Sequence, residues 1–239
     1  MFGQNTVIQS KTMKPYVIIN VAVSADGKMD TFERKGSSIS SAQDKARVLR
    51  LRAEADAVMV GGHTLLSESP KLTVKTPELR AERIAKGLSE NPMKVGVVSK
   101  ADIALEGDFM TAGPARKVIF TTLQTTPEQI NLLSEHGAEV YLMGEKRVDL
   151  ERALETLYQL GVRRLMVEGG GTLNFELLRL GLVDELSVYV APKIFGGGSA
   201  PTMADGDGLV ESAAKTLKLV DVRVLDETGG VLIRYQLIK

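Results

Sequence analysis

Runs of apolar residues alternate along most of the chain with segments that have the spacing of a helix. The first run, PYVIINVAVS at 15–24, is rich in β-branched side chains and is typical of a buried strand. In the segment 40–55 the apolar positions recur every three to four residues, and Ser41 and Asp44 stand in the relation of a helix N-terminal capping box. This pattern predicts a helix directly after the first strand.

The same alternation continues to residue 168. Further strands are predicted at 56–66, where the run passes into a glycine pair, and at 95–99, 117–122, 138–143 and 163–168. Further helices are predicted at 76–87, 125–137 and 148–161. Alternating strands and helices of these lengths favour a largely parallel sheet with helices on its faces.

The C-terminal part has a different pattern. Strands are predicted at 185–192, 216–226 and 230–238, with no helix of comparable length between them. The last two flank ETGG, and their valines, isoleucine and tyrosine alternate with polar residues, Val220, Val222 and Val224 against Val231, Ile233 and Tyr235. This alternation predicts an antiparallel hairpin at the end of the sheet.

These patterns together predict one α/β domain over residues 15–239. Its sheet is expected to be mixed and mostly parallel, flanked by helices, with the antiparallel hairpin at its C-terminal end. Residues 1–14 are expected to be a flexible N-terminal extension, because terminal residues without a strand or helix signal are usually poorly ordered.

Composition narrows the possible partners. Lys plus Arg and Asp plus Glu number 30 each, so no net charge attracts the chain to nucleic acid or to an anionic membrane. No run approaches the roughly 18 apolar residues of a membrane span. The N-terminal residues lack the apolar core of a signal peptide. We therefore expect a cytoplasmic protein with neither nucleic acid nor membrane as a partner.

The chain has no cysteine and only two histidines. This composition excludes disulfides, thiolate catalysis, iron–sulfur clusters and cysteine-based zinc sites. We expect no metal site.

Three consecutive glycines in VEGGGTLN (167–174) lie between a predicted strand and an apparent helix. Unpaired N–H groups at a helix start attract anions, and glycine lets a phosphate come close to them. The Rossmann fingerprint fails because Asn174 stands where a glycine is required, and no Gly-Lys-Ser/Thr of a P-loop follows. The loop therefore predicts a phosphate or pyrophosphate site of another kind, or a tight turn that binds nothing.

A second glycine pair, in VGGHT at 60–64, also follows a predicted strand. If the sheet is parallel there, both glycine loops lie at the same carboxyl edge, where α/β folds bind ligands. Two such loops fit a long ligand with two ends better than a single phosphate.

Three blocks of the sequence resemble the riboflavin-pathway reductases, above all the single-function archaeal and fungal type. They are NVAVSADGK (20–28), LRAEADAVMVGGHTLL with the following Pro70 (51–70), and VEGGGTLN through APT (167–202). The resemblance covers about residues 15–238. It implies a dihydrofolate-reductase-like fold and a homodimer. It also implies NADPH-dependent reduction of the ribosyl C1′ of an aminopyrimidine ribotide 5′-phosphate.

The resemblance leaves several alternatives open. The substrate could be the deaminated ribotide or a pterin-like compound, NADH could replace NADPH, and a non-catalytic nucleotide-binding protein could keep the same glycine loops. The zinc-deaminase motifs H-x-E and P-C-x-x-C of the bifunctional relatives are absent from the sequence. The chain therefore resembles a stand-alone reductase.

The resemblance also implies binding residues. The cofactor side would comprise Ala22, Thr64, Glu68, Ser99, Gly169, Gly170, Gly171 and Thr172. The substrate side would comprise Arg52, Leu72, Lys75 and Glu168. Two positions depart from the pattern of the family: Glu68 stands where aspartate is usual, and Lys75 stands where the bacterial relatives have arginine. A lysine can still meet a phosphate as a point charge.

Reduction at C1′ also requires that a proton be managed at the sugar oxygen or at the nitrogen. Asp26, Lys28 and Glu168 are the ionisable residues of the family-like blocks nearest the expected site, and we take them as the candidate catalytic residues. The alternatives are a turn role for Asp26 in its Asp-Gly pair and a solvated Lys28. A carboxylate at Glu168, at the end of a buried strand, would need a partner.

Overall fold

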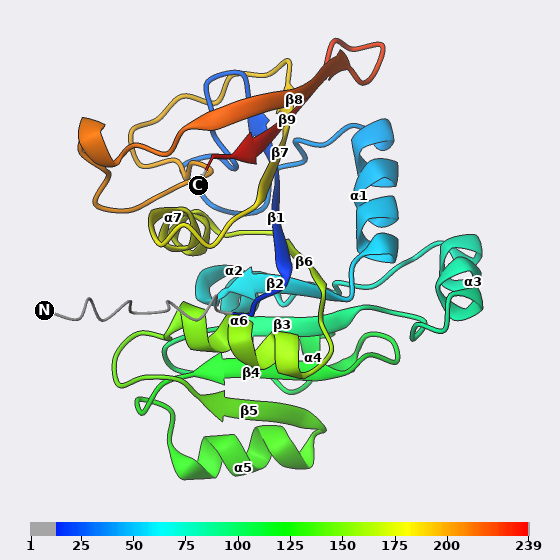
Figure 1. Ribbon diagram of the computed structural model, residues 1–239, viewed down its shortest axis with the longest axis vertical. Helices are drawn as coiled ribbons and strands as arrows, with labels where there is room; N and C mark the ends of the chain where they lie inside the picture. The colour runs from blue at the N-terminus through cyan, green and yellow to red at the C-terminus, as the bar shows by residue number, and fades with distance from the viewer. Residues whose placement is uncertain (1–12, 239) are drawn as a thin grey trace, which may run out of the picture.

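The computed structural model describes residues 13–238, so most of the extension expected at 1–14 lies outside the described residues. Nine strands form one sheet in the order β5-β4-β3-β2-β6-β1-β7-β9-β8, from the lower to the upper end of Figure 1. The strands are β1 Tyr16–Ser24, β2 Ala57–Gly61, β3 Met93–Val97, β4 Lys117–Thr121, β5 Ala138–Leu142, β6 Arg164–Val167, β7 Glu185–Ala191, β8 Leu217–Val224 and β9 Val231–Leu237.

Strands β1 to β7 pair with one another in parallel, and β9 is antiparallel to both β7 and β8. The predicted mixed sheet with a C-terminal hairpin is therefore confirmed. Val222 pairs with Ile233, and Val224 with Val231. Tyr235 pairs with Leu219 and not with Val220, because the register shifts before Asp221.

Helices connect the parallel strands. They are α1 Ala42–Glu54, α2 Gly62–Glu68, α3 Pro77–Ala85, α4 Asp108–Thr111, α5 Pro127–Glu135, α6 Leu150–Gln159 and α7 Gly171–Arg179, with a short 3₁₀ turn η1 at Glu211–Ala213. The hydroxyl of Ser41 caps α1 by accepting from Asp44 N, as the sequence predicts. The strand predicted at 56–66 is wrong beyond Gly61, because the residues that follow form α2. A short apolar run does not distinguish a strand from a buried helix.

The helices bury both faces of the sheet. On one face of the sheet, the side chains of the central strands pack against α6 through Leu154 and Leu157 and against α7 through Leu177. Leu65 of α2 and Leu133 of α5 belong to a second core on the other face. Burial on both faces explains why the strands appear in the sequence as continuous apolar runs.

Two buried cations hold connecting segments against the sheet. Lys94 in β3 is 1% exposed, and its Nζ donates to the carbonyl oxygens of Asp108, Phe109 and Ala112 around α4. Burial lowers the pKa of Lys94 to about 8. The four-residue α4 was not predicted, and the carbonyls at its end are satisfied by this distant side chain. Arg83 of α3 likewise donates to the carbonyl oxygens of Ala53 and Ala55 at the carboxyl end of α1.

Within residues 13–238 no helix combines the length and the apolar character that crossing a membrane requires. Lys14, the last residue of the predicted extension, forms an ion pair of 2.7 Å with Asp184 before β7.

The turn between β8 and β9 is organised by the carboxylate of Asp226. It accepts hydrogen bonds from the hydroxyls of Thr228 and Tyr189, at 2.6 and 2.7 Å, and from Gly230 N at 3.0 Å. The bonds from Thr228 and Tyr189 hold the pKa of Asp226 well below its usual range. The ionised carboxylate therefore ties the hairpin to the parallel part of the sheet.

We expect Asp226→Asn to lower the melting temperature at neutral pH, because an amide accepts these bonds less strongly than a carboxylate. A carboxyl whose pKa is lowered by folding contributes stability above its unfolded pKa and loses it as the pH falls toward the folded value. The difference from the wild type should therefore shrink below about pH 4. Circular dichroism, used to monitor thermal unfolding between acid and neutral pH, measures this difference in melting temperature. Asp207→Asn, at an exposed carboxylate, is the control, and a pH-independent difference would contradict the assignment.

Candidate active site

A cavity of about 720 Å³ opens at the carboxyl ends of β2, β3 and β6, within the usual size range of ligand pockets. A second cavity, of about 560 Å³, lies against α1. Met29 and Ser37 line both, so the two cavities adjoin at the segment that follows β1. A ligand in the larger cavity can therefore meet a ligand in the smaller cavity at this junction.

The glycine run beside the larger cavity has a separate physical reason at each position. Gly169 has φ of 97°, a conformation that favours glycine, and its oxygen accepts from Gly61 N at 2.7 Å. The peptide bond from Gly169 to Gly170 is cis. A Cβ on Gly171 would lie 2.5 Å from Thr202 O. Gly170 lines the cavity, and a Cβ there would meet only the Thr64 hydroxyl at 3.5 Å, so its position leaves open space for a ligand.

Gly61 and Gly62 allow close packing beside the glycine run 169–171. A Cβ on Gly61 would lie 3.0 Å from Leu173 Cβ, and one on Gly62 would lie 3.1 Å from a methyl group of Val98. Both Gly61 and Gly62 line the larger cavity together with Gly170 and Gly171. The prediction that the two glycine loops share one edge of the sheet is confirmed.

The residues expected to bind the cofactor gather largely at the larger cavity. Its wall contains Thr64, Glu68, Ser99, Gly170, Gly171 and Thr172. Gly169 stands directly behind this wall. Ala22 lines the smaller cavity, beside the junction. The expected cofactor side thus follows the larger cavity and reaches the smaller one only at Ala22.

Glu68 ends α2 in this wall. Loss of solvent around its carboxyl raises the pKa of Glu68; the charge of His63 opposes this effect and that of Asp30 adds to it. Asp30 itself organises the loop after β1, because its carboxylate accepts from the backbone N–H groups of Gly36 and Ser37, each at 2.9 Å. These bonds fix Ser37 at the junction of the cavities.

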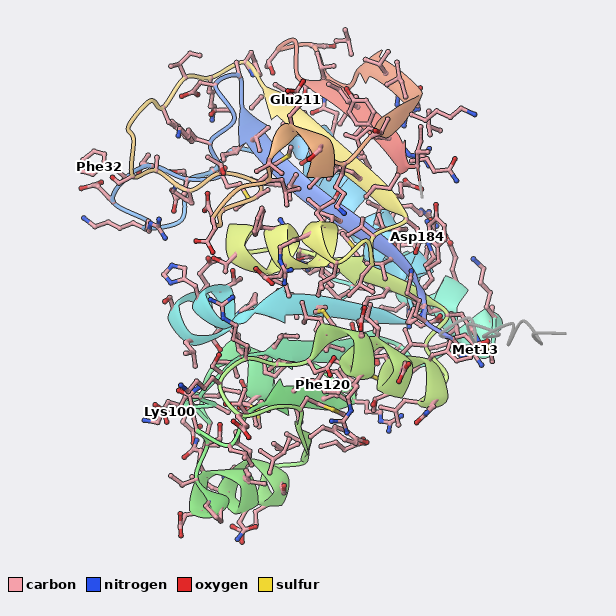
Figure 2. The ribbon with its side chains drawn as sticks, turned by 60° about the vertical axis from the view of Figure 1, so that its left-hand side comes forward. Met13, Phe32, Lys100, Phe120, Asp184 and Glu211 are labelled. Atoms are coloured by element: carbon pink, nitrogen blue, oxygen red, sulfur yellow. The ribbon has the colours of Figure 1, made fainter. Side chains whose placement is uncertain are left out.

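Two loops flank the junction. Met29 N donates to Pro201 O at 2.8 Å, and Lys28 forms an antiparallel bridge with Thr202. The loop after β1 and the segment that follows β7 are thereby paired. Figure 2 shows Phe32 at the outer end of the first loop, and its side chain is 69% exposed.

Asp26 ties the same two loops together. Its carboxylate accepts from the hydroxyl of Ser24 at 2.6 Å and from the backbone N–H groups of Gly196 and Phe195 at 2.7 and 3.2 Å. The bond from Ser24, with those from the two N–H groups, lowers the pKa of Asp26 to about 2. Among the described residues the Nζ of Lys28 has no hydrogen bond or ion pair. Neither residue belongs to the wall of a cavity, but Lys28 directly precedes Met29 at the junction.

The smaller cavity is basic. The ionisable residues of its wall are Lys45, Arg52 and Lys75, and none of the described residues that line it carries a carboxylate. The rest of the wall is apolar or carries serine hydroxyls, those of Ser37, Ser38 and Ser40. Such a wall suits an anionic group such as a phosphate ester.

Arg52 and Glu168, both expected on the substrate side, pair with each other. Arg52 Nε and Nη2 donate to the two carboxylate oxygens of Glu168, each at 2.6 Å, and Nη1 donates to Thr73 O at 3.2 Å. Burial tends to lower the pKa of Arg52, but the charge and hydrogen bonds of Glu168 outweigh this effect and raise it. The partner that a buried carboxylate at Glu168 requires is therefore Arg52.

A buried arginine supports this pair from behind. Arg83 is 2% exposed, and its Nη1 donates to the oxygens of Ala53 and Ala55 at 3.0 and 2.6 Å, at the carboxyl end of α1. Asn91 accepts from Val74 N at 2.9 Å and so holds the loop that carries Lys75. Buried hydrogen bonds therefore fix both α1, which carries Lys45 and Arg52, and the loop that carries Lys75.

Leu72 lies away from both cavities. It is fully buried with φ of 51°, and it packs in the core beneath α2. The residue that resembles a substrate-binding position of the family therefore has its side chain in the hydrophobic core.

Four residues that line the cavities were not predicted from the sequence, namely Lys45, Met29, Ser37 and Arg147. A signal for Lys45 was present, since it precedes Arg52 by seven residues and so lies on the same face of α1. Nothing in the sequence brings Arg147 to the site, because it comes from the distant loop before α6.

Across the described residues, no group of three or more His, Asp and Glu side chains is arranged to hold a metal ion. The fold and site define an α/β protein with a cavity of about 720 Å³ on glycine loops beside a smaller cavity lined by basic residues. The chain belongs to the RibD C-terminal domain family, whose model matches residues 15–230.

Similar proteins agree with this membership. A 2,5-diamino-6-ribosylamino-4(3H)-pyrimidinone 5′-phosphate reductase of Archaeoglobus fulgidus is 41% identical over 93% of this chain and 99% of that protein. A reductase of the same name from Methanothermobacter thermautotrophicus is 42% identical over 84% of this chain and 88% of that protein. The resemblance to the riboflavin-pathway reductases is confirmed.

Among solved structures, RibD of Acinetobacter baumannii is similar with a TM-score of 0.77 and 25% identity. The similarity covers 94% of this chain and 58% of that protein, so this chain spans a little over half of its length. The riboflavin biosynthesis reductase of Saccharomyces cerevisiae shares the fold with a TM-score of 0.68, over 94% of this chain and 90% of that protein, at 19% identity. The implied dihydrofolate-reductase-like fold is confirmed.

Replacing Gly170 with valine should abolish NADPH binding while leaving the fold intact, because the new side chain would extend into the larger cavity and not into packed atoms. The nicotinamide fluorescence of NADPH measures binding without interference, since the chain has no tryptophan. Circular dichroism checks the fold. Gly198→Val, at an exposed glycine with open space around it, is the control. Unchanged NADPH affinity in the Gly170 variant would contradict the cofactor role of this loop.

Proposed function

We propose that the chain is a reductase of riboflavin biosynthesis that uses a nicotinamide cofactor. Its substrate would be 2,5-diamino-6-ribosylamino-4(3H)-pyrimidinone 5′-phosphate, with the ribosyl group reduced at C1′ to the ribitylamino product. One observation carries the proposal: a cavity on glycine loops adjoins a cavity whose ionisable wall residues are all basic. The names of the archaeal relatives support the choice of substrate.

The residues of the larger cavity fit a dinucleotide. Gly170 leaves room for a pyrophosphate at the start of α7, and Thr64 and Thr172 offer hydroxyls beside it. When bound, the cofactor supplies a hydride to the C1′ carbon. The protein would contribute mainly by orientation, since Met29 and Ser37 line the place where the two ligands would meet.

Opening the ribosylamine to an imine and reducing it requires one proton for the nitrogen in addition to the hydride. Of the three candidates we assign proton transfer to Lys28, which has no partner among the described residues and precedes Met29 at the junction. Both oxygens of Glu168 are held by Arg52, which supports an orienting role for Glu168. The bonds of Asp26 to the second loop support a positioning role for it.

We expect purified protein to oxidise NADPH with this ribotide and to form one ribitylamino product for each NADPH consumed. Absorbance of NADPH and chromatography of the product measure the reaction. The deaminated ribotide and a pterin are the comparison substrates. Turnover of only a comparison substrate would overturn the choice of substrate, and NADPH binding without any turnover would overturn the enzymatic role.

We propose NADPH as the preferred cofactor. The sheet order puts β1 and the junction toward one end of the larger cavity and the loop between β5 and α6 toward the other. With the nicotinamide at the junction, the adenosine would lie near this loop. Arg147 of the loop lines the cavity and is 82% exposed, and its one ion pair within residues 13–238 is a 3.9 Å contact with Glu176. Glu176 is paired more closely with Arg179, at 2.7 Å, which leaves Arg147 available for a 2′-phosphate.

Arg147→Ala should lower kcat/KM with NADPH by about tenfold, equivalent to about 1.4 kcal/mol, because a charged contact to the 2′-phosphate is lost. The value with NADH, which lacks that phosphate, should remain within twofold. Steady-state kinetics with both cofactors test this expectation. Lys146→Ala, at the neighbouring cation outside the cavity wall, is the control. Equal losses with both cofactors would exclude Arg147 as the source of the preference.

We also propose a cytoplasmic homodimer. The edge strand β8 exposes Leu219, Val220, Val222 and Val224, each by more than half of its surface. A long apolar edge strand invites pairing with a second chain, which supports a dimer formed there. A phosphorylated substrate and a reduced nicotinamide cofactor are both metabolites held inside cells, which supports the cytoplasm.

A further inference from the structure

One face of α1 forms a continuous wall of the smaller cavity. Lys45, Val48, Leu49 and Arg52 all line it. Their spacing of three, four and seven residues is that of a single helical face. Two cations therefore stand two turns apart on this wall, with an apolar step between them.

The charge of Arg52 is already matched. Its guanidinium gives one donor to each oxygen of Glu168 and a third to Thr73 O, out of five donors in all. A fork engaged in this way cannot also grip a phosphate through the same pair of donors. The positive charge that the cavity wall carries beyond this ion pair therefore resides on Lys45 and Lys75.

Lys45 is free to meet an anion. Within the described residues its Nζ has one hydrogen bond, to the Ser38 hydroxyl at 3.3 Å, and no ion pair. The preceding Asp44 does not neutralise it, because its carboxylate pairs with Arg47 at 2.7 Å on the buried side of the helix. Ser38 lines the same cavity, so an ammonium and a hydroxyl lie side by side in the wall.

We propose that Lys45 is a substrate-binding residue that, together with Lys75 and the Ser38 hydroxyl, takes the phosphate monoester of the substrate, while Arg52 holds the wall in place through Glu168. The inference rests on the proposed function for the identity of the substrate. The phosphate site itself depends only on the cavity and its charges.

The first test uses ribose 5-phosphate as the probe, measured by isothermal titration calorimetry on the full chain. Wild type should bind it, Lys45→Met should bind it about tenfold more weakly, and Lys45→Arg should retain most of the affinity. Arg50→Met removes the same charge from the opposite face of α1, where Arg50 pairs with Glu82, and should leave binding unchanged. No binding by wild type, or equal binding by wild type and Lys45→Met, would overturn the proposal.

The second test uses turnover of the ribotide and of its dephosphorylated form. Lys45→Met should raise KM for the phosphorylated form about tenfold, leave kcat within twofold, and leave kcat/KM for the dephosphorylated form unchanged. Equal losses for both forms would overturn the phosphate role. If wild type turns over neither form but the ribose 5-phosphate results hold, the phosphate site stands and the proposed substrate is wrong.

Discussion

The ion pair between Arg52 and Glu168 joins side chains that are 116 residues apart in the sequence. α1 carries Arg52 in the connection from β1 to β2, and β6 ends one residue before Glu168. Because Arg52 lines the smaller cavity and Glu168 precedes Gly169, the pair fixes one cavity relative to the other. The two side chains are 14% and 15% exposed, so removing one partner would leave the other charge with little compensation from solvent. The two residues therefore act as one structural unit.

This pair depends on the order of the strands. β6 lies between β2 and β1, although it follows both in the chain, so each of its edges is hydrogen-bonded. The loop after β6 continues this pairing through Glu168 N to Met59 O and Gly61 N to Gly169 O. The glycine loop is thus an extension of the most central part of the sheet. A loop held in this way can present N–H groups to a ligand with little loss of conformational freedom on binding.

The sequence predicts the sheet and the position of the glycine loops, because periodicity and turn chemistry are local properties. It does not separate the three glycines, since only the fold shows that Gly171 packs against Thr202 whereas Gly170 faces open space. Arg83 and Lys94 look like ordinary surface cations in sequence, and their burial follows from carbonyl groups of distant segments. Leu72 shows the converse, since its motif matches a binding pattern while only the fold shows that its side chain lies in the core.

The two cavities differ in charge although the chain as a whole is neutral. The larger one is lined by both signs, including Glu68 and Glu176 with Arg147, whereas the ionisable residues of the smaller one are all cations. A neutral protein has no long-range field to steer an anion, and salt screens charges beyond about 8 Å in physiological solution. Under the proposed function, discrimination between a phosphorylated and an uncharged sugar would therefore occur by contact inside the smaller cavity. Lys45 and Lys75 in its wall suit this proposed task, because neither has an ion pair among the described residues whereas Arg52 is paired with Glu168.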